Sequence, residues 1–398
     1  MIRFNIERSE IMDYLKRANE LYKDTVENRR YIHQNAESGL DLVNTRSYIK
    51  KKLIEYGIEP VDCGYGITAT IGKGDKTIML RADMDALVMD EDSGESFACT
   101  NGNAHACGHD LHSAMLLTAG RMLKENEDHL SGKVKLMFQP GEEIFKGCEN
   151  MLDNGLLDDQ VDAAIAYHIA SGLPVGLFMY NSDGLLMNSV DMFKIYIEGK
   201  GSHGACPDQS IDPINIGCHI YLSLQELIAR EAKPYQSCVL TIGEFQAGTA
   251  PNIIPEKVVL SGSIRTNNEN ERSKLVRRLE EVVKLQSEVF NGKARVEWLS
   301  NVPALVCDGE LIKEVAGYMK EIAPDATGYD HITATASEDF ALLSEKIPVS
   351  YMYIGAGFSD GRKQYDLHNP KVTMNEDVLP IGSAYMAHCA SRWLEMHK

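Results

Sequence analysis

The residue types that bind metal ions gather in one short segment of the chain. The sequence HACGHDLH, residues 105–112, holds three histidines and one cysteine in eight residues. Imidazole and thiolate are the ligands that zinc and similar borderline metals prefer, and ligands two residues apart, such as Cys107 and His109, can bind one ion from a loop. A helix cap by Asp110 beside incidental histidines is the alternative interpretation.

Paired carboxylates follow two apolar runs. Asp83 and Asp85 stand in RADMDAL, directly after the strand-like run Thr77–Leu80. Carboxylates two residues apart point the same way if the chain is still extended, although a turn or a helix cap would also use these residues.

A second acidic pair, Glu142 and Glu143, follows the apolar run Lys133–Phe138 and the turn residues Pro140 and Gly141. Adjacent glutamates after a turn are expected to point in different directions, so that one could bind metal while the other transfers protons. Solvated surface is the alternative for a Glu pair in a loop.

Two further histidines complete the set of candidate ligands. His168 ends the apolar run Asp162–Tyr167, and His368 precedes an Asn-Pro turn in YDLHNP. Either histidine alone could be structural. Together with Cys107, His109 and Glu143, however, they could hold two divalent ions, which need several protein ligands and an open position for water.

The elements that must position these residues alternate between strands and helices. The runs Thr77–Leu80, Val134–Phe138 and Val161–Tyr167 are strand-like, whereas Ser47–Tyr56 and Leu111–Lys124 are helical. This α/β alternation predicts a mostly parallel central sheet with flanking helices. Ligands bind outside the carboxyl ends of the strands in such sheets, which is where the carboxylates and histidines are expected.

The middle of the chain has a different pattern, β-α-β-β-α-β, which matches an α+β ferredoxin-like arrangement. Its predicted elements are Met192–Glu198, Ile214–Arg230, Cys238–Phe245, Lys257–Arg265, Asn270–Phe290 and Ala294–Leu299. The α/β pattern then resumes with a helix at Leu311–Ile322, a short helix near Glu338–Leu343, a strand at Ser350–Ile354 and a helix from Leu379. We therefore expect a catalytic domain at residues 1–186 and 301–398, with an inserted lid and dimerisation domain at 187–300.

Composition excludes several classes of protein. The 398 residues are 44% hydrophobic and 25% charged, as in ordinary globular proteins, and the formal charge of −18 disfavours nucleic acid and anionic membrane surfaces as partners. No apolar run approaches the length of a spanning helix, and the N-terminal MIRFNIERSEIMDYLKR lacks the apolar core of a signal peptide. The odd number of cysteines, nine, favours reduced thiols. These features predict a cytoplasmic protein.

These residues together resemble the family of co-catalytic metal amidohydrolases and carboxypeptidases that includes hippurate hydrolase, N-acetyl-diaminopimelate deacetylase and indole-acetyl-amino-acid hydrolase. The resemblance covers nearly the whole chain, in the order Arg30-Tyr31-Ile32-His33, RADMDAL, HACGHDLH, FQPGEE, GSHGACPD, APNIIPE, GSIRT, SEDF and LHNP. HACGHD with a later PGEE is its most specific part. Two departures, Gln34-Asn35 after His33 and Val88 after RADMDAL, bear on substrate preference rather than on the reaction.

The resemblance implies a set of roles. Cys107, His109, Glu143, His168 and His368 would be the metal ligands, and Glu142 the general base. In the lid, His203 would reach an active site, that of the partner subunit in a homodimer, and steady the oxyanion. Asn252 and Arg265 would contact the substrate, and the planar fork of an arginine suits an α-carboxylate. Asp83 or Asp85 could orient a ligand histidine by a hydrogen bond to it, without binding the metal itself.

The expected reaction is hydrolysis of the amide bond of an N-acyl amino acid by a metal-activated water. The ligand set admits two zinc ions, or manganese, cobalt or nickel. A dipeptidase or carboxypeptidase on the same site remains an alternative, as do a thiol hydrolase with Cys107 as nucleophile and a ligand-binding protein without chemistry.

Overall fold

The structure is a computed structural model, and it describes residues 12–398. Most of the N-terminal segment that was expected to lack a signal-peptide core lies outside the described residues. The chain divides into two compact units, which we describe separately. Unit 1 comprises Met1–Gly184, Cys307–Thr333 and Leu343–Lys398, and unit 2 comprises Leu185–Val306 and Ala334–Leu342. The domain boundaries at 186 and 300 stay a prediction.

Unit 1 is built on an eight-stranded sheet of order β1-β2-β6-β3-β7-β18-β8-β17. The neighbours β6, β3, β7 and β18 run parallel, and β1, β2 and β8 add antiparallel pairs towards the edges. The sheet strands are β1 Val61–Cys63, β2 Gly66–Gly72, β3 Thr77–Asp83, β6 Lys133–Gln139, β7 Ala163–Pro174, β8 Leu177–Met179, β17 Thr327–Tyr329 and β18 Val349–Gly357. A separate short pair joins β4 Leu87–Val88 to β5 Asn103–Ala104. The predicted mostly parallel α/β sheet is confirmed.

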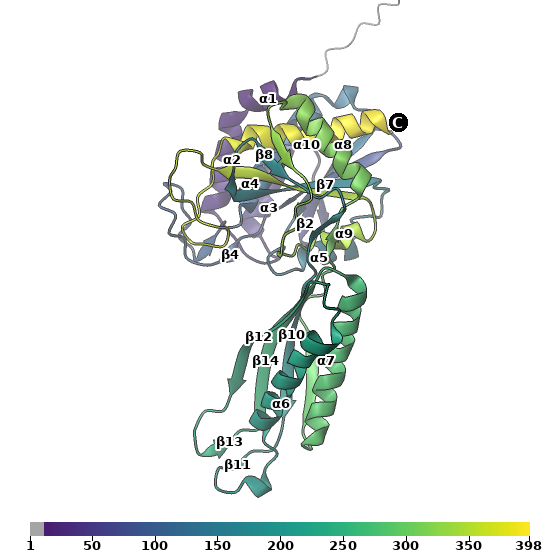
Figure 1. Ribbon diagram of the computed structural model, residues 1–398. Helices are drawn as coiled ribbons and strands as arrows, with labels where there is room; N and C mark the ends of the chain where they lie inside the picture. The colour runs from purple at the N-terminus through teal and green to yellow at the C-terminus, as the bar shows by residue number, and fades with distance from the viewer. Residues whose placement is uncertain (1–11) are drawn as a thin grey trace, which may run out of the picture. The chain divides into compact units, whose positions relative to one another are not determined.

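Helices surround this sheet (Figure 1). They are α1 Tyr14–Glu20, α2 Tyr22–Gln34, α3 Val43–Glu55, α4 His109–Glu125, α5 Gly147–Asp153, α8 Gly309–Ile322 and α10 Val378–Met396, with a 3₁₀ turn at Glu127–His129. The short helix α9 Ala341–Ser344 spans the division of the two units between Leu342 and Leu343. Every residue of β3 is buried, and α4 and α10 pack on β3 and on each other. A strand covered on both faces reads as a continuous apolar run, which is why Thr77–Leu80 could be recognised in the sequence.

One strand extends further than the sequence indicated. The predicted strand Val161–Tyr167 stops before His168, whereas β7 continues to Pro174 because β18 pairs with it over that length. His168 lies opposite Tyr353 of β18. The candidate ligand is therefore held within a paired strand rather than in a loop after it.

Unit 2 contains a four-stranded antiparallel sheet of order β12-β14-β10-β15. Its elements in chain order are β10 Asp191–Glu198, α6 Pro213–Glu226 with the π-helical turn Leu227–Glu231, β12 Cys238–Ala247, β14 Lys257–Thr266, α7 Glu269–Val289 and β15 Lys293–Trp298. This order confirms the predicted ferredoxin-like pattern. Short elements complete the unit: β9 Leu185–Met187 with β16 Leu305–Val306, β11 Ser202–His203 with β13 Ile253–Ile254, and the 3₁₀ turn Pro207–Gln209.

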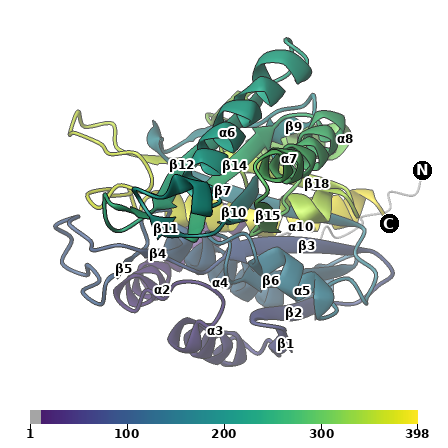
Figure 2. The ribbon, with the colours of Figure 1, turned by 90° about the horizontal axis from the view of Figure 1, so that it is seen from below.

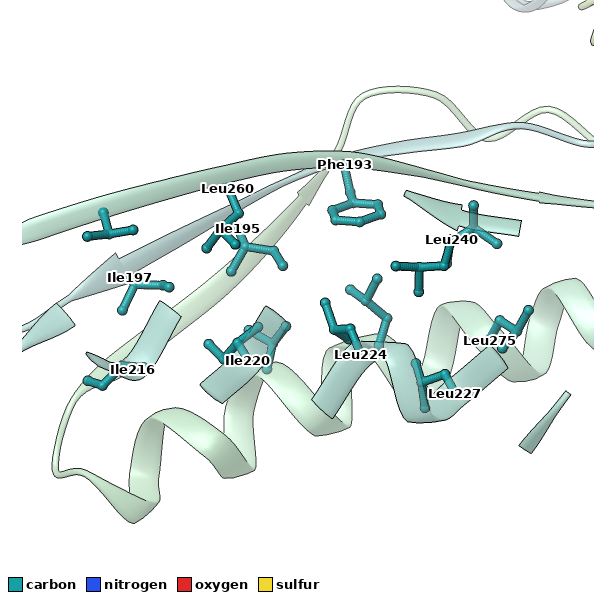
Figure 3. Close-up of a cluster of buried hydrophobic side chains, with 14 residues drawn as sticks. Phe193, Ile195, Ile197, Ile216, Ile220, Leu224, Leu227, Leu240, Leu260 and Leu275 are labelled. Atoms are coloured by element: carbon teal, nitrogen blue, oxygen red, sulfur yellow. The ribbon is translucent and has the colours of Figure 1, made fainter. Parts of the chain in front are cut away.

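The core of unit 2 lies between this sheet and its two helices, α6 and α7, which pack side by side (Figure 2). Alternate residues of β10, Phe193, Ile195 and Ile197, point inward and meet Ile220 and Leu224 of α6 (Figure 3). Buried and less buried residues alternate along β10, as expected for a strand with one buried face. The apolar area that this face buries is the main contribution to the stability of the unit.

None of the helices in the described part of the chain is long and apolar enough to cross a membrane. All nine cysteines lie among the described residues, and each is a free thiol.

Candidate metal centre

Five of the predicted ligands converge at one edge of the unit 1 sheet. In two groups, each with one donor atom per residue, these atoms lie within 4.8 Å of one another: Cys107 with His109 and His168, and Cys107 with Glu143 and His368. The two groups share Cys107, so two cation positions would be adjacent. The donors come from the start of α4, the turn after β6, the middle of β7 and the loop before α10.

Cys107 and His168 face each other inside the protein. The Cys107 Sγ lies 3.4 Å from His168 Nε2, and both residues are buried. Nδ1 of His168 donates to the carbonyl of Ile169 at 2.7 Å, which leaves Nε2 with its lone pair. Burial lowers the pKa of His168, so its ring is neutral. A neutral imidazole with a free nitrogen beside a thiol suits a borderline metal ion.

His109 shows most directly that the site fits a cation. Its side chain is fully buried, yet neither ring nitrogen makes a hydrogen bond of normal geometry to any residue that the structure describes. Asp83 and Asp85 lie 3.5 and 3.4 Å from its two nitrogens. Burial lowers the pKa of His109, but Asp83 and its neighbours raise it well above the usual value. The surroundings of this ring therefore carry an excess of negative charge, which a divalent cation would neutralise.

The two glutamates are held by a carboxylate from the neighbouring strand. Asp85 accepts a hydrogen bond from the backbone N–H of Glu142 and another from that of Glu143, each at 3.1 Å. The preceding turn uses Gly141 at φ 62°, a conformation that favours glycine. Asp85 thus fixes the Glu-Glu turn while its Oδ1 also approaches His109.

The side chains of this pair do not diverge as expected. Glu142 Oε2 and Glu143 Oε1 both lie 3.9 Å from His109 Nε2, because the turn places both carboxylates over the same imidazole. Oε1 of Glu143 makes no hydrogen bond of normal geometry within residues 12–398, and burial raises the pKa of this carboxyl. Burial favours the neutral carboxylic acid of Glu143, whereas a cation bound beside it would favour the ionised carboxylate.

His368 is the most exposed of the candidate ligands, with 55% of its side chain accessible. It adopts φ 65°, and its backbone N–H donates to the carbonyl of Ala106 at 2.9 Å. Its Nε2 lies 3.5 Å from Glu143 Oε1. One backbone hydrogen bond therefore joins the loop of His368 to the loop of Cys107, although more than 250 residues separate them in sequence.

Gly108 allows the tight turn between Cys107 and His109. It precedes α4 at φ 87°, and a Cβ there would lie 2.6 Å from Cγ1 of Ile169 and 2.9 Å from Sδ of Met374. Both the backbone conformation and the close approach require glycine.

The three predicted residues of the lid lie in unit 2, and their roles stay predictions. His203 and Asn252 are exposed and adjoin, because Gly204 N–H donates to Asn252 O at 2.8 Å. Arg265 lies near the end of β14, eight residues beyond its first residue, Lys257. Since a strand advances about 3.3 Å per residue, Arg265 is roughly 25 Å from the end of the sheet beyond which β11 and β13 lie (Figure 1).

His112 and Arg81 also belong to the site, although neither was predicted as a site residue. Both are buried, and both bind Asp83: His112 Nδ1 lies 2.6 Å from its Oδ1, and Arg81 Nη1 donates to Oδ2 at 2.8 Å. The spacing of His109 and His112, three residues apart on one helix, could have indicated that the two rings share a face. No comparable local signal marks Arg81.

The fold and this cluster of donors define a metal-dependent hydrolase, and comparisons with known proteins agree. The profile of Peptidase family M20/M25/M40 matches residues 79–392. N-acetyl-L-cysteine deacetylase of Bacillus subtilis (strain 168) is 37% identical over 95% of this chain and 90% of its own. An IAA-amino acid hydrolase of Arabidopsis thaliana is 33% identical over 96% of this chain and 88% of its own.

Among solved structures, a dinuclear metal-binding peptidase of the M20 family from Bacillus subtilis has a TM-score of 0.78 at 30% identity, over 95% of this chain and 99% of that one. The chain belongs to Peptidase family M20/M25/M40, and this confirms the resemblance found in the sequence.

Proposed function

We propose that this enzyme hydrolyses the amide bond between an acyl group and the nitrogen of an amino acid, releasing a carboxylic acid and the free amino acid. The observation that carries the proposal is the convergence of Cys107, His109, Glu143, His168 and His368 on one place, with Glu142 beside them. The names of the relatives, a deacetylase of N-acetylcysteine and a hydrolase of IAA-amino acids, support the N-acyl amino acid as substrate class.

The five converging side chains would hold two divalent ions, zinc in the first instance, with manganese, cobalt and nickel also compatible with this mixture of ligands. When bound, such ions polarise a carbonyl and lower the pKa of a water molecule towards neutrality.

Glu142 is the proposed general base. It takes a proton from the attacking water and passes it to the leaving nitrogen, as a buried carboxylate near the ligands is placed to do. Asp85 supports this role by holding the backbone of Glu142. In the lid, Nδ1 of His203 accepts from the N–H of Ala205 at 3.1 Å, so a neutral ring carries its proton on Nε2 and can donate to a developing oxyanion.

Arg265 is the proposed anchor for the free carboxylate of the substrate, with Asn252 as a further substrate contact. Its guanidinium is half-buried, and burial lowers its pKa. Nη1 donates to Ser337 Oγ at 2.6 Å, and no carboxylate in the described part of the chain lies within ion-pair distance of it. A partly desolvated arginine without an acidic partner is suited to bind an anion in a bidentate manner.

The separation of these residues supports a homodimer through the lid. His203 lies beyond one end of the unit 2 sheet and Arg265 near the other, roughly 25 Å away. One small substrate cannot touch both within one copy, so a site that uses both would draw them from two chains. The edge strand β12 exposes Val239 and Phe245 and could pair with a second copy.

A thiol hydrolase with Cys107 as nucleophile is less well supported. The distance of 3.4 Å from Sγ to His168 would suit such a pair. However, burial raises the pKa of Cys107 well above its usual value and lowers that of His168, so the thiol stays protonated and is a weak nucleophile.

A reducing compartment, the cytoplasm, is proposed because all nine cysteines are free.

The test is amine release from N-acetyl, N-benzoyl and longer N-acyl amino acids and from dipeptides, each with untreated, chelated and metal-reconstituted enzyme. We expect activity on N-acyl amino acids that is lost on chelation and returns with a divalent ion. Activity that resists chelation would point to Cys107 as nucleophile, and a preference for dipeptides would favour the peptidase alternative. Ligand binding without turnover on any substrate would contradict the proposal.

A further inference from the structure

His112 lies one turn after His109 in α4 and is fully buried. Both nitrogens of its ring are engaged. Nδ1 lies 2.6 Å from Oδ1 of Asp83, and Nε2 accepts a hydrogen bond from the backbone N–H of Ile169 at 2.9 Å. A ring that uses both nitrogens in this way joins β3 to β7 through the helix.

The partners define which nitrogen carries the proton. A backbone N–H can only donate, so Nε2 of His112 must be the acceptor. In the neutral ring the proton is then on Nδ1, where it is donated to Asp83. The second oxygen of Asp83 accepts from Nη1 of the buried Arg81 at 2.8 Å. Arg81 and Asp83 therefore hold His112 in one tautomer and one orientation.

The residue whose backbone His112 holds, Ile169, also orients His168. The carbonyl of Ile169 accepts from Nδ1 of His168 at 2.7 Å, while its N–H is bound by His112. A displacement of Ile169 would turn the His168 ring away from the Sγ of Cys107, 3.4 Å distant. The contacts thus run in a line from Arg81 through Asp83, His112 and Ile169 to His168.

We infer that His112 is a positioning residue of the metal centre, which directs Nε2 of His168 towards the cation by clamping the backbone of Ile169. The inference rests on the proposed function, since His168 is a proposed ligand. His112 could itself have been a ligand, because its ring lies close to Asp83 and His109. The engagement of both its nitrogens makes the positioning role the one that the geometry supports.

Two substitutions separate the two hydrogen bonds of His112, one with Asp83 and one with the N–H of Ile169. In His112→Asn the amide nitrogen replaces Nδ1, so the hydrogen bond to Asp83 is kept and the one from Ile169 is lost. In His112→Gln the amide oxygen reaches the place of Nε2, so the bond from Ile169 is kept. If His112 only stabilised the fold, metal binding would not depend on which of its two hydrogen bonds is kept. Metal binding that is preserved in His112→Gln but weakened in His112→Asn therefore distinguishes a positioning role from a structural one. His388→Asn is the matched control, a buried histidine of α10 bound to Glu321.

The probe is cobalt(II) chloride added to metal-free protein, followed by calorimetry and by the absorption of the cobalt–thiolate bond. We expect His112→Asn to bind cobalt about tenfold or more weakly than wild type, with an altered spectrum, and His112→Gln to stay within about threefold of wild type. Cobalt binding by His112→Asn that equals wild type, or by His112→Gln that is as weak as His112→Asn, overturns the inference.

A second measurement needs no variant. Nitrogen-15 spectra of the metal-free wild-type protein should show His112 protonated on Nδ1 and not on Nε2. A proton on Nε2 overturns the inference, and this spectrum decides the matter if neither variant folds, as judged by thermal unfolding.

The experiment also separates this inference from the proposed function. Wild-type protein that binds two cobalt ions and hydrolyses N-acyl amino acids, while His112→Asn binds cobalt equally well, refutes the inference alone. Wild-type protein that binds no cobalt refutes the metal centre and the inference with it.

Discussion

Glu142 is the side chain on which the proposed proton transfer depends. Glu142→Gln keeps the size of the side chain and leaves all five proposed ligands in place, but it removes the basic oxygen. We expect the turnover number to fall at least a hundredfold while metal content stays at the wild-type level. Steady-state kinetics and elemental analysis of the same preparation measure both. A variant that keeps more than about a tenth of the wild-type rate would show that another group is the base.

Asp85 supports the site without being a proposed ligand. Asp85→Ala removes the acceptor for the N–H groups of Glu142 and Glu143, whereas Asp85→Asn leaves one oxygen that can still accept. We expect metal affinity to fall roughly tenfold to a hundredfold in the alanine variant and less in the asparagine variant. Competition with a coloured chelator measures this, with the exposed Asp75→Ala as control. Equal affinities for Asp85→Ala and wild type would leave Asp85 without this role.

At the scale of elements, Gly108 makes the tight turn before α4 and packs closely against Ile169. Gly108→Ala would force a side chain into φ 87° and into Ile169. We expect it to lower the free energy of unfolding by about 1–3 kcal/mol and to weaken metal binding. Gly317→Ala is the matched control, because it lies inside α8 with nothing within 4 Å of the added Cβ. That change should be neutral or stabilise by up to about 1 kcal/mol. Urea unfolding compares the two, and equal effects would argue against the strain at Gly108.

A buried charge cluster joins α2 to α4. His33 lies 2.9 Å from Asp110 and 3.0 Å from Glu91, and Arg29 also binds Asp110, at 2.7 Å. Burial lowers the pKa of His33, but these carboxylates raise it to about 9. Because the pKa in the folded state lies above the unfolded value of about 6.5, the stabilisation is complete below pH 6.5 and is lost as the pH rises through about 9.

The variant His33→Gln lacks this titration. We expect it to be less stable than wild type at pH 7, and we expect the difference in unfolding free energy to shrink by roughly 2 kcal/mol between pH 7 and pH 9. Urea unfolding at both values measures it, with the exposed His219→Gln as control. A difference that stays constant with pH would mean that His33 is not charged in the folded protein.

For the whole molecule, the proposed sharing of His203 between two chains predicts complementation. Glu142→Gln and His203→Ala should each be nearly inactive alone. In a hybrid dimer, the subunit with an intact Glu142 receives His203 from its partner. An equal mixture, unfolded and refolded together, should therefore recover about a quarter of wild-type activity, since half of the dimers are hybrids with one complete site each. No recovery in a mixture shown to contain hybrids would place His203 in the site of its own chain.

The sequence alone determined the order of the elements and the types of the donor groups. The apolar runs of β3 and β6 and the alternation along β10 reflect burial that repeats within a few residues, so they can be read locally. The same holds for the spacing of Cys107 and His109. The continuation of β7 past His168 was not predicted, because its pairing with the distant strand β18 decides it. The helices α1 and α2 and the antiparallel edge strands were not predicted either.

Only the tertiary structure decided how the donors are supported. Asp85 lies 57 residues from the Glu142 backbone that it binds, and His112 lies 57 residues from Ile169. The direction of Glu142 and Glu143 and the unpartnered nitrogens of His109 likewise depend on which strands become neighbours. A hydrogen bond requires a definite distance and angle between two groups, and these are set by the packing of the whole unit. Residue type could therefore predict the chemistry, while the protonation and orientation of each group follow from the fold.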